Sequence, residues 1–187
     1  MPPSPRSRLL SAATLVVAAT LAATPIAHAR SFVIKARGSQ TTLGEVRAIG
    51  DFKPSRNPRL GAAIRAYGEP SSRRGGGEAC TVRWANLGVR IKFANFGGFD
   101  SCRRRGLAQK AVINGDRPWR TAKGLGLGDT TSRARRLYPQ ARETPCGLRL
   151  VEAVLPFGTP HRYAVLGARV GSGRVRAFTL FIGAAGD

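Results

Sequence analysis

One pattern of residues occurs twice in the chain, and it constrains the fold more than any other feature of the sequence. The first copy begins at Ile49-Gly50-Asp51 and the second at Leu127-Gly128-Asp129. In each copy a helical pattern follows, then a tyrosine close to a proline, then a cysteine that precedes a strand pattern. Because the order is kept and only the loop lengths differ, we interpret the pattern as a tandem repeat.

The repeat predicts an α+β fold built from two tandem helix-plus-antiparallel-sheet units that pack together as one body. Residues 30–106 form the first predicted unit and residues 107–187 the second, after a signal peptide at residues 1–29. Residues 80–94 alternate as a hairpin does, with Val82, Trp84, Ile91 and Phe93 on one face. We expect the first helix to cover this apolar face.

The segment from Asn57 to Tyr67 has the strongest helix signals. Asn57 is a favourable N-cap, and Pro58 suits the first helical position because its missing N–H would be unpaired there anyway. Gly68 suits the left-handed stop after the helix. Apolar residues recur at the spacing of one helix face: Leu60, Ala63, Ile64 and Tyr67.

The remaining segments have weaker signals. Asp129 or Thr130 caps a second predicted helix that ends at Tyr138, and Thr42 begins a short predicted helix through Val46. We expect residues 71–78 to form a polar loop, and Trp119 to be a core residue of the second unit. The predicted strands after the first hairpin lie at residues 108–114, 148–155, 163–170 and 174–182, of which the last three form an antiparallel meander.

The N-terminal residues have the features of a secretory signal. Arg6 and Arg8 form a positive region, Leu9 to Thr24 is apolar or small, and Ala27-His28-Ala29 fits a cleavage site before Arg30. The apolar run is shorter than the roughly 20 residues of a membrane-spanning helix. We therefore expect a protein that is secreted or held in the cell envelope, with a retained N-terminal anchor as the alternative.

The cysteines agree with export. Disulfides form in oxidising compartments, and an odd number of cysteines leaves one thiol without an intramolecular partner. Cys80 and Cys102 bracket the predicted hairpin, so we favour a disulfide between them, with Cys146 as a small buried residue. A bond between Cys80 and Cys146 is the alternative, if the two units face each other.

The chain is strongly basic. Its formal charge is +21. Loss of Arg6 and Arg8 with the signal peptide leaves +19. Such a charge attracts acidic polymers and anionic membranes, although an arginine-rich composition is also typical of GC-rich genomes. The candidate polyanion contacts are Arg83, Arg90, Lys92, Arg103, Arg104 and Arg105.

No segment has the pattern of a catalytic or cofactor site. Residues 30–187 contain one histidine, His161, and its pairing with Cys146, oriented by Asp129, is the one conceivable nucleophilic arrangement. The glycines at 75–77 and at 124–128 lack the strand and helix frame of a phosphate or dinucleotide loop. We expect no enzyme activity, no catalytic residue, no bound metal and no cofactor.

Two short motifs suggest a family resemblance. Leu125-Gly126-Leu127-Gly128-Asp129-Thr130 matches a turn that opens a helix, and Tyr67-Gly68-Glu69-Pro70 matches the end of such a helix. In these motifs the chain resembles the beta-lactamase inhibitory proteins and the small outer-membrane assembly lipoproteins. It is also similar to arginine-rich exported proteins of actinobacteria. The resemblance implies a tandem helix-plus-sheet fold and non-enzymatic binding of another protein.

Together these features give two functional hypotheses. The first is a secreted, non-catalytic binding protein that engages a protein partner in the envelope or outside the cell. The alternative is a basic surface protein that binds acidic wall polymer or anionic membrane. Exported proteins rarely meet genomic DNA, so we expect no nucleic-acid partner. The oligomeric state is left open.

Overall fold

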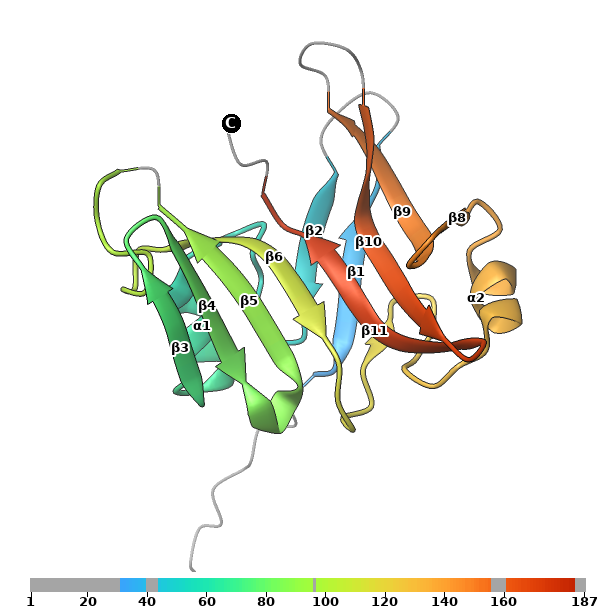
Figure 1. The fold of residues 1–187 in the computed structure, drawn as a ribbon, viewed down its shortest axis with the longest axis horizontal. Coiled ribbons are helices and arrows are strands. Elements are labelled where there is room, and N and C mark those ends of the chain that lie inside the picture. The colour runs from blue at the N-terminus through green and yellow to red at the C-terminus, as the bar shows by residue number, and fades with distance from the viewer. Residues whose placement is uncertain (1–30, 40–43, 96, 156–160, 184–187) are drawn as a thin grey trace, which may run out of the picture.

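The chain is a mostly β protein whose strands form a large antiparallel sheet and a small mixed one (Figure 1). The computed structural model describes residues 31–39, 44–95, 97–155 and 161–183. Half of the structure (50%) is strand and 13% is helical. The predicted signal peptide and Thr42 lie outside the described residues.

The large sheet has eight strands and continues through both predicted units. Its strand order is β3-β4-β5-β6-β11-β10-β9-β8, and every neighbouring pair is antiparallel. The strands are β3 (Ser72–Gly76), β4 (Ala79–Trp84), β5 (Val89–Ala94), β6 (Leu107–Ile113), β8 (Arg142–Thr144), β9 (Gly147–Leu155), β10 (His161–Gly171) and β11 (Arg174–Phe181).

The predicted fold of two tandem helix-plus-sheet units is therefore wrong. Strand β6 pairs with β5 on one side and with β11 on the other, so one sheet includes strands from both predicted units. The predicted boundary after residue 106 falls in the loop that leads into β6. The sequence pattern identified strands and their faces, but it contained no information on which strand edges meet. Joining two half-sheets removes two unpaired edges, which are a liability in an isolated sheet.

The small sheet crosses behind the large one. It has the order β2-β1-β7, from β1 (Val33–Arg37), β2 (Glu45–Ile49) and β7 (Arg120–Thr121). The parallel pairing of β1 with β7 is a second connection between the two halves of the chain. In Figure 1, β1 and β2 lie behind β6 and β11. Strand β2 replaces the predicted short helix through Val46, because Glu45–Ile49 pairs with β1 along its length.

One helix covers the first part of the large sheet as predicted. Helix α1 (Leu60–Tyr67) buries Leu60 and Tyr67 against the hairpin of β4 and β5, and the Tyr67 ring lies 5.2 Å from that of Trp84. The Tyr67 hydroxyl donates to the carbonyl of Ile49 over 2.6 Å. Burial raises the pKa of Tyr67 well above its ordinary value, and the Asp51 carboxylate raises it further, so the hydroxyl stays a donor at neutral pH.

The predicted start of α1 is wrong by a few residues. The helix begins at Leu60, because Arg59 forms a β-bridge with Leu107 and is held in extended backbone. Asn57 still caps locally, but its side chain accepts from the N–H of Arg59 before the helix begins. The predicted end is confirmed, since Gly68 has a φ of 83° and its N–H donates to the carbonyl of Ile64.

The second helix is shorter than predicted and lies at the far end of the sheet. Helix α2 (Thr131–Leu137) has Thr130 as its N-cap, whose hydroxyl accepts from the N–H of Arg133. Tyr138 follows as the C-cap. Of the two predicted caps, Thr130 is therefore the one confirmed, and Asp129 instead stabilises the preceding turn by accepting from the N–H of Gly126.

The segment from Ser72 to Gly76 is a strand, where a polar loop was predicted. All its side chains are exposed, so it has no apolar alternation for the sequence to show. Backbone pairing with β4 over five residues defines it as an edge strand. The placement of this strand adds Arg73 and Arg74 to opposite faces of the sheet.

The Cys80–Cys102 disulfide is confirmed, and Cys146 is exposed. The predicted burial of Cys146 is wrong, because this residue lies in the tight turn between β8 and β9, outside the core. The disulfide ties the loop before β6 to β4, whose Cys80 side chain is fully buried. A sequence separation of 22 residues closes a loop of moderate size.

Trp119 is buried as predicted, but it connects the two halves of the chain. Its indole Nε1–H donates to the carbonyl of Leu87 over 2.7 Å, and its ring meets Phe32 edge-on at 5.2 Å. Leu87 lies in η1 (Ala85–Leu87), the short 3₁₀ turn between β4 and β5. The segment that leads from β6 to β7 is therefore attached to the hairpin end.

We expect replacement of Cys80 and Cys102 by alanine to lower the free energy of unfolding by about 3 kcal/mol, because the unfolded chain regains loop entropy. Urea denaturation of residues 30–187 measures this change. Cys146→Ser is the matched control and leaves the midpoint unchanged, since Cys146 is exposed and free. Equal midpoints for the double variant and the wild type would contradict the expected role.

Trp119→Phe is expected to cost about 2 kcal/mol of stability, because it leaves the carbonyl of Leu87 without its buried donor. Thermal and urea denaturation measure the loss. Arg117→Gln removes a neighbouring exposed donor to the Asn86 carbonyl and should cost under about 0.5 kcal/mol. A Trp119 variant no less stable than the Arg117 variant would count against the bridging contact.

Candidate polyanion-binding face

One face of the large sheet is basic over its first strands. Successive side chains of a strand point to opposite faces. The residues that alternate with the buried Val82, Trp84 and Ile91 therefore point away from α1. We call this surface the basic face, and its cationic members, all exposed, are Arg74, Arg83, Arg90, Lys92 and Lys110.

Cations on this face lie directly opposite one another across neighbouring strands. Arg83 of β4 is paired in register with Arg90 of β5, and Lys92 of β5 with Lys110 of β6. Like charges in such positions destabilise a sheet. Strands β3 to β6 contain no acidic residue. Within the described ranges, no ion pair involves any cation of the basic face.

The other end of the same sheet shows how such repulsion is relieved. Arg142 of β8 and Arg149 of β9 are also directly opposite. Here the Glu152 carboxylate lies between them, 3.6 Å from Arg142 Nε and 3.5 Å from Arg149 Nη1. Its side chain is only 13% exposed, and Arg162 approaches it to 3.9 Å. The chain thus supplies a carboxylate at one arginine pair and none at the pairs of the basic face.

The six residues that the sequence suggested for polyanion contact divide between two surfaces. Arg83, Arg90 and Lys92 share the basic face. The run from Arg103 to Arg105 lies on the side of α1, where the carbonyl of Arg104 accepts from the N–H of Gly61 over 2.9 Å. A single flat ligand therefore cannot contact all six side chains at once.

Arg74 and Lys110 belong to the basic face although the sequence did not single them out. Arg74 lies in a segment without apolar alternation, so the edge strand that positions it left no pattern. Lys110 lies in a predicted strand, and the alternation of Lys110 and Val112 with the buried Ala111 and Ile113 was a usable signal. What was missing was the pairing of β6 with β5.

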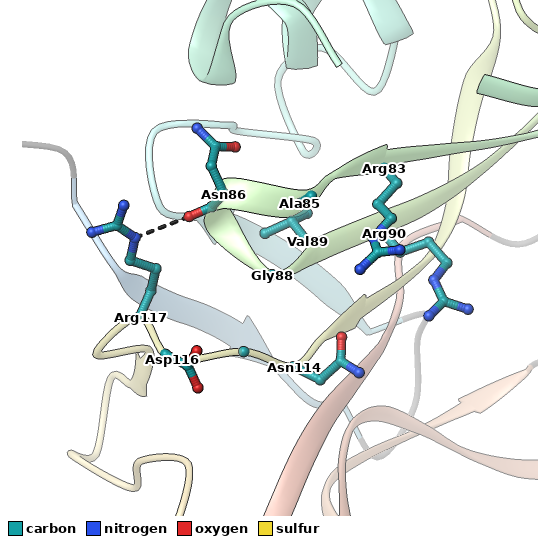
Figure 2. A pocket seen from close by; sticks show the side chains of 10 residues that line it. Arg83, Ala85, Asn86, Gly88, Val89, Arg90, Asn114, Asp116 and Arg117 are labelled. Atoms are coloured by element: carbon teal, nitrogen blue, oxygen red, sulfur yellow. Dashed lines mark hydrogen bonds between the residues drawn. The ribbon is translucent and has the colours of Figure 1, made fainter. Parts of the chain in front are cut away.

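The basic face ends in a groove beside the turn between β4 and β5 (Figure 2). This hairpin-end groove has a volume of about 470 Å³. Arg83 and Arg90 project from the hairpin, and the strand exit after β6 forms the other wall. Its polar side chains are Arg83, Asn86, Arg90, Asn114, Asp116 and Arg117. They combine cations, amides and one carboxylate within one cavity.

Cys146 and His161, the one conceivable nucleophilic pair in the sequence, lie at opposite ends of β9. Cys146 precedes β9, and His161 pairs with Leu155 at the other end of that strand. Eight residues of strand separate the two positions by roughly 26 Å. Among the described residues, no group of three histidine, cysteine or acidic side chains is arranged to hold a metal ion.

The glycine clusters at 75–77 and 124–128 lie in an edge strand and in turns, where they have a structural role. Gly75 lies in β3 at a φ of 105°, where a β-carbon would come within 2.5 Å of the Ala79 carbonyl oxygen. Gly128 has a φ of 84° in the turn before α2, and its carbonyl accepts from Arg174 over 3.0 Å. Both positions therefore require glycine for turns and strand pairing, and this accounts for the glycines without a phosphate ligand.

Comparisons of the chain with protein-family models, with curated proteins and with solved structures found no match. The resemblance to the beta-lactamase inhibitory proteins and the outer-membrane assembly lipoproteins therefore stays a prediction, and the tandem fold that it implied is the part that the structure corrects.

We expect Arg90→Thr to stabilise the protein by about 0.5 kcal/mol at low ionic strength, because it removes a cation opposite Arg83. The gain should vanish in about 1 M salt, where the screening length falls to about 3 Å. Thermal denaturation at both salt concentrations measures it.

Arg169→Thr is the matched control for this change. Arg169 is also an exposed strand arginine, but it lies opposite Ala177 on one side and Gly147 on the other. The same substitution there changes strand propensity and net charge equally without relieving a cation pair. Equal shifts for the two variants would contradict the repulsion on the basic face.

Proposed function

We propose that this chain is a non-catalytic protein of the cell envelope or exterior that binds an acidic polymer through its basic face. The observation that supports this most directly is that two pairs of cations lie opposite each other across neighbouring strands without an ion-pair partner among the described residues, Arg83 with Arg90 and Lys92 with Lys110. A bound polyanion supplies the negative charge that the protein places elsewhere as Glu152. Binding would then relieve a repulsion that exists in the free protein.

The location outside the cytoplasm is supported by the disulfide and the predicted signal peptide. Disulfides persist in oxidising compartments, and Cys80 and Cys102 form an intramolecular disulfide. None of the helices in the described part of the chain is long and apolar enough to cross a membrane. Acidic polymers such as polyuronates and polyphosphates of the envelope are accessible there.

The composition of the basic face favours a polymer over a membrane surface. Proteins that lie on membranes insert apolar or aromatic side chains beside their cations. The side chains between the cations of the basic face are small and uncharged, and include Ser72, Thr81 and Val112. The outward-facing positions of β3 to β6 include no aromatic residue, so the face also lacks the stacking platforms typical of single-stranded nucleic-acid binding.

A protein partner is the second candidate function, and one feature on the opposite side favours it. A groove of about 570 Å³ contains the half-buried Phe99 among Arg73, Arg103, Arg104 and Arg105. Charge complementarity points to an acidic segment that presents an apolar side chain as its occupant. A pull-down from native envelope that recovers no such protein, with residues 30–187 as bait, would count against this function.

The polymer hypothesis predicts salt-dependent retention on immobilised alginate and polyphosphate. Replacing Arg83, Arg90, Lys92 and Lys110 by glutamine removes four exposed contacts worth about 0.5 kcal/mol each, which amounts to a roughly 30-fold loss of affinity at low salt. Retention of wild type should fall steeply as salt rises. Binding to phosphatidylglycerol vesicles that equals or exceeds binding to both polymers would overturn the choice of a polymer.

A matched control separates the basic face from the overall charge. Glutamine at Lys53, Arg56, Arg65 and Arg136 removes the same net charge from exposed positions outside the basic face. This control should keep at least about half of the wild-type affinity, because each removed charge is distant from the ligand. Equal losses for the two variants would show that net charge alone causes retention, and would contradict the proposal.

A further inference from the structure

The hairpin-end groove is built as a rigid site, because successive carbonyls of one turn accept hydrogen bonds from one other segment. The carbonyl of Asn86 accepts from Arg117 Nε over 2.9 Å, and that of Leu87 from Trp119 Nε1 over 2.7 Å. The carbonyl of Gly88 accepts from the N–H of Asn114 over 2.8 Å. Three successive residues of the turn are thus hydrogen-bonded to the segment that follows β6.

Glycine permits the two segments to approach closely at the base of the groove. A β-carbon on Gly88 would lie 2.2 Å from the Asn114 carbonyl oxygen and 3.0 Å from the α-carbon of Gly115. Gly88 also has a φ of 65°, which other residues rarely adopt. The two backbones therefore pack against each other without side chains between them. The polar side chains that line the groove extend from these closely packed backbones.

Two guanidinium groups at this site have no acidic partner in the protein. Arg83 and Arg90 lie opposite each other and project to the same side of the hairpin (Figure 2). Within the described residues no hydrogen bond or ion pair involves either side chain. Paired guanidinium forks match the oxygens of a phosphate or a carboxylate, each of which can accept two parallel N–H bonds.

The rest of the groove is suited to hydroxyl groups. Asn86 and Asn114 each offer an amide donor and acceptor, and the Asp116 carboxylate accepts only. A carboxylate in an anion site repels a second anion but accepts hydrogen bonds from hydroxyl groups. Arg117 lies beside Asp116 at this end, and its Nε donates to the Asn86 carbonyl. The arrangement thus places Arg83 and Arg90 next to an end that offers both hydrogen-bond donors and acceptors, within about 470 Å³, which falls in the size range of small-ligand sites.

We infer that the hairpin-end groove binds one repeat unit of the acidic polymer, namely a phosphate or carboxylate carried on a polyhydroxylated sugar or polyol. Arg83 and Arg90 bind the anionic group, while Asn114 and Asp116 bind its neighbouring hydroxyls. The inference rests on the proposed function, because it assigns a chemical class to the polymer held on the same face. Charge alone would attract any polyanion, whereas this groove would select polymers whose repeat unit carries hydroxyl groups.

Titration calorimetry of residues 30–187 with glucose 6-phosphate, glucuronate and inorganic phosphate tests the inference. At least one sugar acid should bind about tenfold more tightly than inorganic phosphate, since two added hydrogen bonds are worth about that factor. Preference for glucose 6-phosphate would identify a phosphate unit, and preference for glucuronate a carboxylate unit. Inorganic phosphate binding as tightly as both sugar acids would overturn the inference.

Variants then assign the two ends of the groove. Arg83→Gln with Arg90→Gln should abolish binding of all three probes, whereas Asn114→Ala and Asp116→Asn should remove only the preference for the sugar acid. Amide shifts of Gly88 and Gly115 in NMR spectra report both the intact fold and the site of binding. A preference that survives Asn114→Ala and Asp116→Asn in folded protein would contradict the hydroxyl contacts.

The outcomes distinguish this inference from the proposed function. Loss of selectivity for sugar acids, with salt-dependent retention on alginate or polyphosphate still dependent on the basic face, would overturn the groove assignment alone. Selective binding of a sugar acid without retention on either polymer would overturn the polymer function and support a site for a small ligand.

Discussion

The whole structure depends on the pairing of β6 with two neighbours. Its hydrogen bonds with β5 join it to the first hairpin, and those with β11 join it to the C-terminal meander. Without these bonds the strands of the large sheet would form two smaller sheets, each with an additional unpaired edge. With them, one face of a single sheet becomes the core, where Ala111, Ile113 and Phe178 are buried, and the opposite face remains in solvent.

This division of faces also explains the electrostatics. Residues that alternate with core residues must point outward, and along β4, β5 and β6 these outward residues include arginine and lysine. The pairing then places Arg83 beside Arg90, and Lys92 beside Lys110. At the other end of the sheet, the Glu152 carboxylate lies close to both Arg142 and Arg149 and compensates their repulsion. The lack of an acidic residue in strands β3 to β6 is therefore the local difference between the two ends of the sheet.

Local features were predicted well where side-chain chemistry and spacing determine them. The hairpin faces, the burial of Trp119, the cap at Thr130 and the Cys80–Cys102 bond all follow from short-range patterns. Predictions failed where backbone pairing with another segment of the chain decided the outcome. The bridge between Arg59 and Leu107 delays α1, and pairing with β1 turns the predicted short helix into β2.

The candidate site shows the same limit. Arg83, Arg90 and Lys92 could be placed on one face from the hairpin alone, because alternation within a strand determines side-chain direction. Arg103 to Arg105 were grouped with them by charge, but packing of this loop against Gly61 puts them on the side of α1. The hairpin-end groove had no sequence signal, because its walls come from residues that are distant in sequence.

The amino-acid sequence by itself determined which residues alternate, which turns need glycine, and that Cys80 and Cys102 lie within reach of each other. These properties depend on local geometry and on the side chains of neighbouring residues. Only the tertiary structure decided that the repeated pattern merges into one sheet, that uncompensated cations stand opposite each other, and that Asn114 and Asp116 complete a groove beside Arg83. Each of these depends on which strand edges pair, and the free energy of that choice is shared among contacts far apart in the chain.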